Sequence, residues 1–174
     1  MGITMPLAYL DSCIIIYLVE EDPLFAPAIE NHLANHPNVI PAFSALSEME
    51  CLVMPLRQNN HVLVNRFRDW FQSAALYLPM ERDIARQAAQ LRATHTGLKT
   101  PDALHLATAQ HYGCSEFWTN DDRLCKVAPL LARKRLLENL YHACDTLSRA
   151  PCRRNNTRIW LNQNIASLLA TVAS

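Results

Sequence analysis

Four acidic residues lie far apart in this chain. The residues beside each of them predict that the four side chains meet at one site. Asp11 and Asp121 each follow a short apolar stretch typical of a β-strand, so both are expected at carboxyl ends of strands. In open parallel sheets, this edge is where functional sites form. The four residues are Asp11 in LAYLDSCIIIYLVE, Glu50 in SALSEMECLV, Asp102 in KTPDALHLATA and Asp121 in FWTNDD.

Carboxylates that converge at one edge of a sheet repel one another unless a divalent cation or shared protons compensate their charge. Magnesium takes oxygen ligands and is commonly held by a few carboxylates with several waters, one of which could act as a nucleophile. The four acids therefore predict a magnesium or manganese site. We expect Asp11 and Asp102 to be the most direct ligands, with Glu50 and Asp121 completing the pocket directly or through water.

Two of these acids have a structural alternative at a helix start. Thr100 is the expected cap of a helix with Pro101 at its first position, so Asp102 falls in the first turn, where an acid stabilises the helix by about 0.3 to 1 kcal/mol. Glu50 stands three residues after Ser47, which is capping-box spacing. If Ser44 is the cap instead, Glu50 falls in the second turn and can point inward.

The remaining positions near the acids also allow two interpretations. Glu48 competes with Glu50, and Asp121 and Asp122 could both be turn residues after a strand. Asp122 is otherwise a possible helper in the site. Hydroxyls beside ligating carboxylates can orient them, so Ser12 and Thr119 are candidates for that role or simply a helix-cap and a strand-end residue. His105 is expected to pack or to form a hydrogen bond.

Short apolar segments alternate with segments of helical periodicity, which favours an α/β fold with a largely parallel sheet. The helical segments are 81–96, followed by Gly97, and 100–112, followed by Gly113. The chain has three glycines, which excludes a glycine-rich phosphate loop. Strands are expected at residues 7–10, 39–42, 75–78 and 116–119, with a further one at 135–139.

The chain has 174 residues, of which 50% are hydrophobic, enough for one domain with an appendage. Its longest apolar run is too short to span a bilayer, so we expect a soluble cytoplasmic protein. Residues 1–50 contain no Lys or Arg, whereas 123–158 contain nine. This basic segment could hold a phosphate backbone or be a solvated surface.

Four segments, in order, resemble the motifs of the PIN-domain family, and within it the VapC-type toxin ribonucleases of toxin–antitoxin pairs. They are the strand with Asp11, SALSEMECLV with Glu50, KTPDALHLATA with Asp102, and FWTNDDRL with Asp121. The resemblance favours Glu50 over Glu48 and selects Asp121. It spans about residues 7–140 and implies a PIN-like three-layer α/β/α sandwich with a central, largely parallel sheet of four to five strands.

The same resemblance implies a magnesium- or manganese-dependent endoribonuclease that cleaves RNA, forms a homodimer and is silenced by a cognate antitoxin. We therefore expect a nuclease domain over 1–140 and an extension over 141–174, a basic segment followed by an amphipathic helix. The alternative is a catalytically inactive PIN-like module that binds RNA or protein.

Overall fold

The computed structural model describes residues 5–128 and 132–133 of the chain, and its centre is a parallel β-sheet. The strand order is β3-β2-β1-β4-β5, and every neighbouring pair is parallel. The first and central strand therefore lies between β2 and β4, which follow it much later in the chain. The strands are β1 Leu7–Leu10, β2 Ile40–Ser44, β3 Leu76–Leu78, β4 Glu116–Trp118 and β5 Ala132–Arg133.

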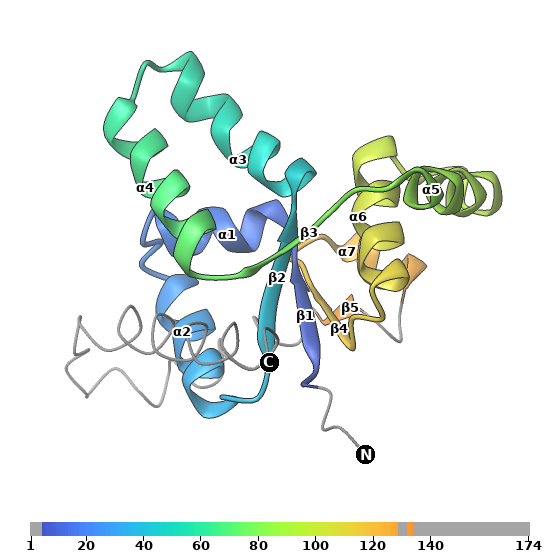
Figure 1. Cartoon of the computed structure of the whole chain (residues 1–174), viewed down its shortest axis with the longest axis horizontal. Coiled ribbons are helices and arrows are strands. Elements are labelled where there is room, and N and C mark those ends of the chain that lie inside the picture. The colour runs from blue at the N-terminus through green and yellow to red at the C-terminus, as the bar shows by residue number, and fades with distance from the viewer. Residues whose placement is uncertain (1–4, 129–131, 134–174) are drawn as a thin grey trace, which may run out of the picture.

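Helices cover both faces of this sheet, so the predicted α/β sandwich with a parallel sheet is confirmed. In Figure 1, α1 to α4 lie on one side of the strands and α5 to α7 on the other. The helices are α1 Ser12–Val19, α2 Ala26–Asn35, α3 Ala45–Arg57, α4 His61–Ser73, α5 Arg82–Thr94, α6 Thr100–His111 and α7 Asp122–Val127.

The alternation of side chains along β1 divides the core in two. Ala8 and Leu10 point into a cluster with α1, α2 and α4, whereas Tyr9 points into a second cluster with α5 and α6. Successive side chains of a strand face opposite sides of the sheet, so a central strand buried on both faces is apolar throughout. The side chain of Asp11, two residues after Tyr9, comes where this strand ends.

Four predicted strands are confirmed to within two residues, and two helix boundaries differ from expectation. The fifth predicted strand, 135–139, lies outside the described residues. The helix expected to run to residue 96 ends at Thr94, before Gly97. The helix that carries Asp102 is capped by Lys99, so Thr100 lies inside its first turn and not at the cap. Gly113 follows this helix with a φ of +63°, which glycine adopts without strain.

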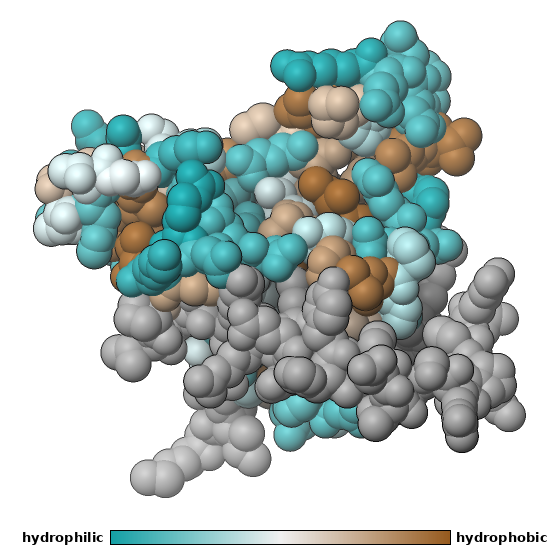
Figure 2. All heavy atoms as spheres, turned by 180° about the vertical axis from the view of Figure 1, so that it is seen from behind, coloured by the Kyte–Doolittle hydropathy of each residue, from teal (hydrophilic) through white to brown (hydrophobic). Residues whose placement is uncertain are grey.

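The outer face of the α3–α4 hairpin exposes large apolar side chains. Met49, Met54, Leu56 and Val62 are each more than half exposed. Figure 2 shows apolar side chains in brown beside hydrophilic ones over this part of the surface. Within the described residues, no helix is both long and apolar enough to cross a membrane. The division into 1–140 and 141–174 stays a prediction, because it falls outside the described part of the chain.

Candidate metal centre

Asp11 occupies the junction between the central strand and α1. Its backbone N–H donates to the carbonyl of Trp118 on β4 at 3.0 Å, which extends the strand pairing up to the site. Its carboxylate caps α1 by accepting from the Ser12 N–H at 2.7 Å and accepts a second bond from the Thr119 hydroxyl at 2.7 Å. The residue is only 9% exposed, so these bonds replace much of its hydration.

Glu50 lies in the second turn of α3, as expected if Ser44 is the cap. Ser44 does occupy the N-cap position, so the alternative in which Ser47 caps the helix is wrong. Oε2 of Glu50 accepts a hydrogen bond from Nε2 of His105 at 2.9 Å. This bond is the main cause of a lowered pKa for Glu50, and it outweighs the partial burial that would raise the pKa. Glu50 is therefore an ionised acceptor at neutral pH.

His105, expected to pack or to form a hydrogen bond, forms one with Glu50. The side chain of His105 on α6 is 2% exposed, and its Nε2 lies 3.9 Å from Oδ1 of Asp11 as well as 2.9 Å from Glu50. One ligand atom from each of Asp11, Glu50 and His105 lies within 4.8 Å of the others. The end of β1, α3 and α6 thus converge at the carboxyl edge of the sheet.

Asp102 lies in the first turn of α6, where the charges of Asp11 and Asp121 act on its carboxylate. Burial is the largest cause of its raised pKa, and the charges of Asp121 and Asp11 raise it further. Arg123 and Lys99 act in the opposite direction. The ionised form of Asp102 is therefore less favourable than that of a free aspartate, as expected for a part-buried acid beside other acids.

Asp121 caps α7, and the guanidinium of Arg123 holds its carboxylate. It accepts from the backbone N–H of Arg123 at 2.8 Å, and both carboxylate oxygens accept from Nε of the same residue at 3.1 Å. Nη2 of Arg123 also donates to Asp121. These contacts lower the pKa of Asp121. The site prediction did not include Arg123, although an arginine two residues from an acid was a usable signal.

The two hydroxyls expected beside the acids contact them. Thr119 donates to Asp11 and accepts from the Asp121 backbone N–H at 3.0 Å, so it links the first and fourth acids. The Ser12 hydroxyl lies 3.4 Å from Asp11 Oδ1 and also lowers the pKa of Glu50. Asp122 is the first residue of α7 and is exposed.

The donor atoms of this centre suit a hard divalent ion. Asp11 and Glu50 offer carboxylate oxygens, the ligands that magnesium and manganese prefer. Nε2 of His105 faces the ionised Glu50, which can only accept, so that nitrogen carries the proton and its lone pair is not available to an ion. The carboxylates of Asp11 and Glu50 suit the predicted metal, and His105 suits the role of a hydrogen-bond donor to Glu50.

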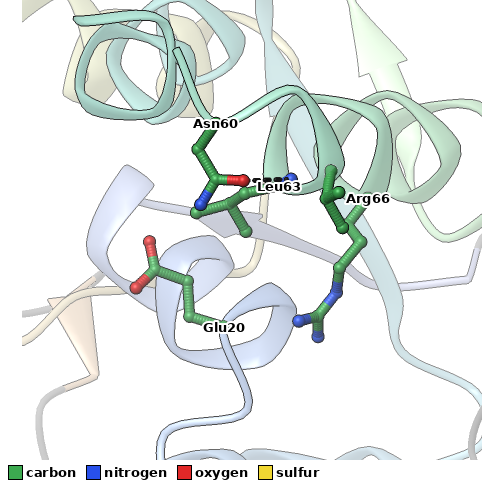
Figure 3. Close-up of a pocket in the computed structure, with 5 residues that line it drawn as sticks. Glu20, Asn60, Leu63 and Arg66 are labelled. Atoms are coloured by element: carbon green, nitrogen blue, oxygen red, sulfur yellow. Dashed lines mark hydrogen bonds between the residues drawn. The ribbon is translucent and has the colours of Figure 1, made fainter. Parts of the chain in front are cut away.

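A separate pocket lies at the other end of α1. Its volume is about 240 Å³, and Glu20, Asn60, Val62, Leu63 and Arg66 line it. Figure 3 shows Glu20 on one wall facing the α4 residues on the other, with Asn60 capping α4 through the Leu63 N–H. None of the four predicted site acids contributes to it, so it is distinct from the candidate metal centre.

Residues 8–130 of the chain match the family model of the PIN domain. No curated protein matches the chain. Among solved structures, VapBC2 from Rickettsia felis, bound to a DNA fragment from its promoter, has a TM-score of 0.59 and 17% identity, covering 73% of this chain and 97% of the other.

Two further structures share the fold. VapC20 of Mycobacterium tuberculosis, a sarcin–ricin loop cleaving toxin, has a TM-score of 0.59 and 15% identity over 68% of this chain and 93% of the other. A toxin–antitoxin complex from Klebsiella pneumoniae has a TM-score of 0.53 and 24% identity over 73% of this chain and 97% of the other. By the extent of the family match and by this shared fold, the chain belongs to the PIN-domain family.

Proposed function

We propose that this protein is a divalent-metal-dependent endoribonuclease, the toxin of a toxin–antitoxin pair. The observation that carries the proposal is the meeting of Asp11 and Glu50 at the carboxyl edge of a PIN-domain sheet, with Asp102 and Asp121 in the same electrostatic environment. The toxins of similar fold named above support the substrate class and the partner. In this proposal the substrate is RNA, the activity is cytoplasmic, the active form is a homodimer, and a cognate antitoxin silences it.

The chain's own residues would hold the ion and arrange the substrate. Asp11, Glu50 and Asp102 supply carboxylates, with Asp121 direct or through water. When bound, magnesium or manganese supplies charge stabilisation at the scissile phosphate and lowers the pKa of an attacking water. Thr119 and Ser12 keep the Asp11 carboxylate in place through their hydrogen bonds. The exposed guanidinium of Arg123 lies beside these acids, where it could contact a phosphate of the RNA.

The direct test incubates purified, partner-free protein with total cellular RNA and magnesium or manganese. Discrete fragments that disappear with EDTA are expected. The control variant Asp83→Asn should cleave RNA like the unaltered protein, because Asp83 is an exposed acid in the first turn of α5 and lies outside the site. RNA binding without turnover under all metal conditions would support the inactive-module alternative and contradict the proposal.

Metal binding should stabilise the folded protein measurably. An ion present at about 100 times its dissociation constant stabilises the native state by about 2.7 kcal/mol. For a chain of this size, that free energy raises Tm by about 5 to 10 °C. Melting curves with magnesium, manganese and EDTA measure the shift. An equal shift in a variant lacking both Asp11 and Asp102 carboxylates would place the ion elsewhere.

Removal of Arg123 should strengthen metal binding and weaken RNA binding. Arg123→Leu deletes the cation that holds Asp121 and lies near Asp102, so competition for the divalent ion is lost. The Arg123 side chain is 56% exposed, so solvent screens its charge, and we expect a gain in manganese affinity of about fivefold or less. Manganese titration followed by electron paramagnetic resonance measures it. Arg86→Leu, which breaks the exposed Asp83 pair, is the control.

A further inference from the structure

A buried hydrogen-bond network lies behind Glu50, and the proposed chemistry does not yet use it. The hydroxyl of Tyr9 on β1 lies 2.9 Å from Nδ1 of His105, 2.6 Å from the Ser44 hydroxyl and 3.3 Å from the Ser47 hydroxyl. Tyr9, Ser44 and Ser47 are fully buried, and His105 is 2% exposed. The network therefore connects the central strand to Glu50 entirely through the protein interior.

The hydrogen bonds of this network run in one direction at its outer end. Glu50 is ionised and can only accept, so His105 must donate from Nε2. In the neutral imidazole, Nδ1 then accepts from the Tyr9 hydroxyl, which in turn accepts from Ser44. In the imidazolium, Nδ1 donates to Tyr9 instead. Nε2–H faces Glu50 in both charge states, so the donor to the carboxylate is permanent.

The packing around Tyr9 leaves this arrangement little freedom. The Tyr9 ring stacks on Phe117 with centroids 5.5 Å apart and meets the His105 ring edge-on at 5.7 Å. Burial raises the pKa of Tyr9 far above its ordinary value, so the phenol keeps its proton. Within the described residues, no buried side-chain nitrogen or oxygen lacks a hydrogen-bond partner. A fully satisfied buried network of this kind fixes one geometry.

Such a network is not required for stability alone, because well-packed apolar side chains of similar volume often serve a core equally well. At its outer end, Nε2 of His105 donates to the part-buried carboxylate of Glu50 at 2.9 Å, and the same nitrogen lies 3.9 Å from Oδ1 of Asp11. The Nε2–H bond holds Glu50 in one orientation beside a second carboxylate that would otherwise repel it. Orientation of a ligating carboxylate by a hydrogen-bond donor is a common way to tune metal affinity.

We infer that His105, held by Tyr9, is a positioning residue that orients Glu50 toward a divalent ion and is not itself a ligand of that ion. The inference rests on the proposed metal site and adds to it the pair that aligns one of its carboxylates. Tyr9 acts only through His105, and His105 acts only through Glu50.

The first test observes His105 in the unaltered full-length protein. Nitrogen-15 NMR of the imidazole is recorded without metal and with saturating magnesium, and the His105→Gln spectrum assigns the signal. We expect Nε2 of His105 to keep its proton in both states. Loss of that proton on magnesium binding, or a directly coordinated nitrogen in the pulsed electron paramagnetic resonance spectrum of the manganese form, would overturn the inference.

The second test distinguishes a role of His105 in positioning Glu50 from a role in core packing alone. His105→Leu removes the donor and should weaken manganese binding by about 10- to 100-fold. His105→Gln keeps an N–H at the place of Nε2 and should retain most of the affinity. Tyr9→Phe removes one hydrogen bond and should cost about threefold to tenfold. Tyr112→Phe, which deletes a hydroxyl bonded to the Pro79 carbonyl, and His111→Gln should leave manganese affinity unchanged.

Failure of this inference can be told apart from failure of the proposed function. Equal manganese affinity in His105→Leu, His105→Gln and the unaltered protein, with folded circular-dichroism spectra, would refute the positioning role even if RNA is cleaved. The expected order of affinities without any RNA cleavage would refute the nuclease and leave the positioning role intact. If His105→Leu does not fold, the affinity of Tyr9→Phe still tests the positioning role, and the NMR result in the unaltered protein decides whether His105 is a ligand.

Discussion

Replacement of Asp11 by asparagine is expected to lower the rate of RNA cleavage by about a thousandfold or more. A bound ion contributes several kcal/mol to charge stabilisation in the transition state, and each 1.36 kcal/mol corresponds to a tenfold change in rate. Asp11 is the most buried of the four acids and is held by both Ser12 and Thr119. Asparagine retains the shape but lacks the charge that would bind the ion.

This loss should come with little change in folding. Asparagine caps a helix as well as aspartate does, so its side-chain oxygen can still accept from the Ser12 N–H. The matched control is Asp22→Asn, because the Asp22 carboxylate also caps backbone amides, those of Leu24 and Phe25 at 2.9 Å. Initial cleavage rates and melting curves in EDTA are measured for both variants. Full activity in Asp11→Asn would remove this residue from the site.

The second large effect is expected from Asp102→Asn, which should weaken manganese binding by about 10- to 100-fold and reduce cleavage in proportion. A first-turn acid stabilises its helix by about 0.3 to 1 kcal/mol. For Asp102 this gain is opposed by burial and by the charges of Asp121 and Asp11, which raise its pKa. Loss of its charge should therefore cost the metal-free protein less stability than loss of an ordinary first-turn acid.

Asp83→Asn provides that ordinary case, since Asp83 lies in the first turn of α5, is exposed and pairs with Arg86 at 2.7 Å. Chemical denaturation in EDTA measures the stability of both variants, and manganese titration measures their affinity. If Asp102 only supported its helix, both variants would lose similar stability and neither would lose metal affinity. That outcome would exclude Asp102 from the centre.

The local features of the sequence predicted β1 to β4 to within two residues, because each is a short apolar run between polar segments. They also predicted that Glu50 points inward when Ser44 is the cap, since the outcome depends only on helical spacing. The hydrogen bond between Glu50 and His105 joins residues 55 positions apart, and no local pattern encodes it. Only the packing of α3 against α6 brings these side chains together.

The Tyr9 network was missed for the same reason. A tyrosine in an apolar strand is ordinarily a core residue, and its hydroxyl acquires a partner only when β1, α3 and α6 are assembled. Arg123 is close to Asp121 in the sequence and so was a local feature. Its hydrogen bonds to both carboxylate oxygens of Asp121 nevertheless depend on how α7 begins. Spacing thus selected the candidate acids, whereas three-dimensional packing determines which groups contact them.

The central position of β1 also bears on when activity can arise during synthesis. The first acid is translated early, but its strand neighbour β4 and the last acid follow more than 100 residues later. Domains emerge from the ribosome from the N-terminus at about 5 to 20 residues per second. A growing chain therefore holds Asp11 for several seconds without Asp102, Thr119 or Asp121, so the proposed nuclease site cannot be complete until nearly the whole PIN domain has been synthesised.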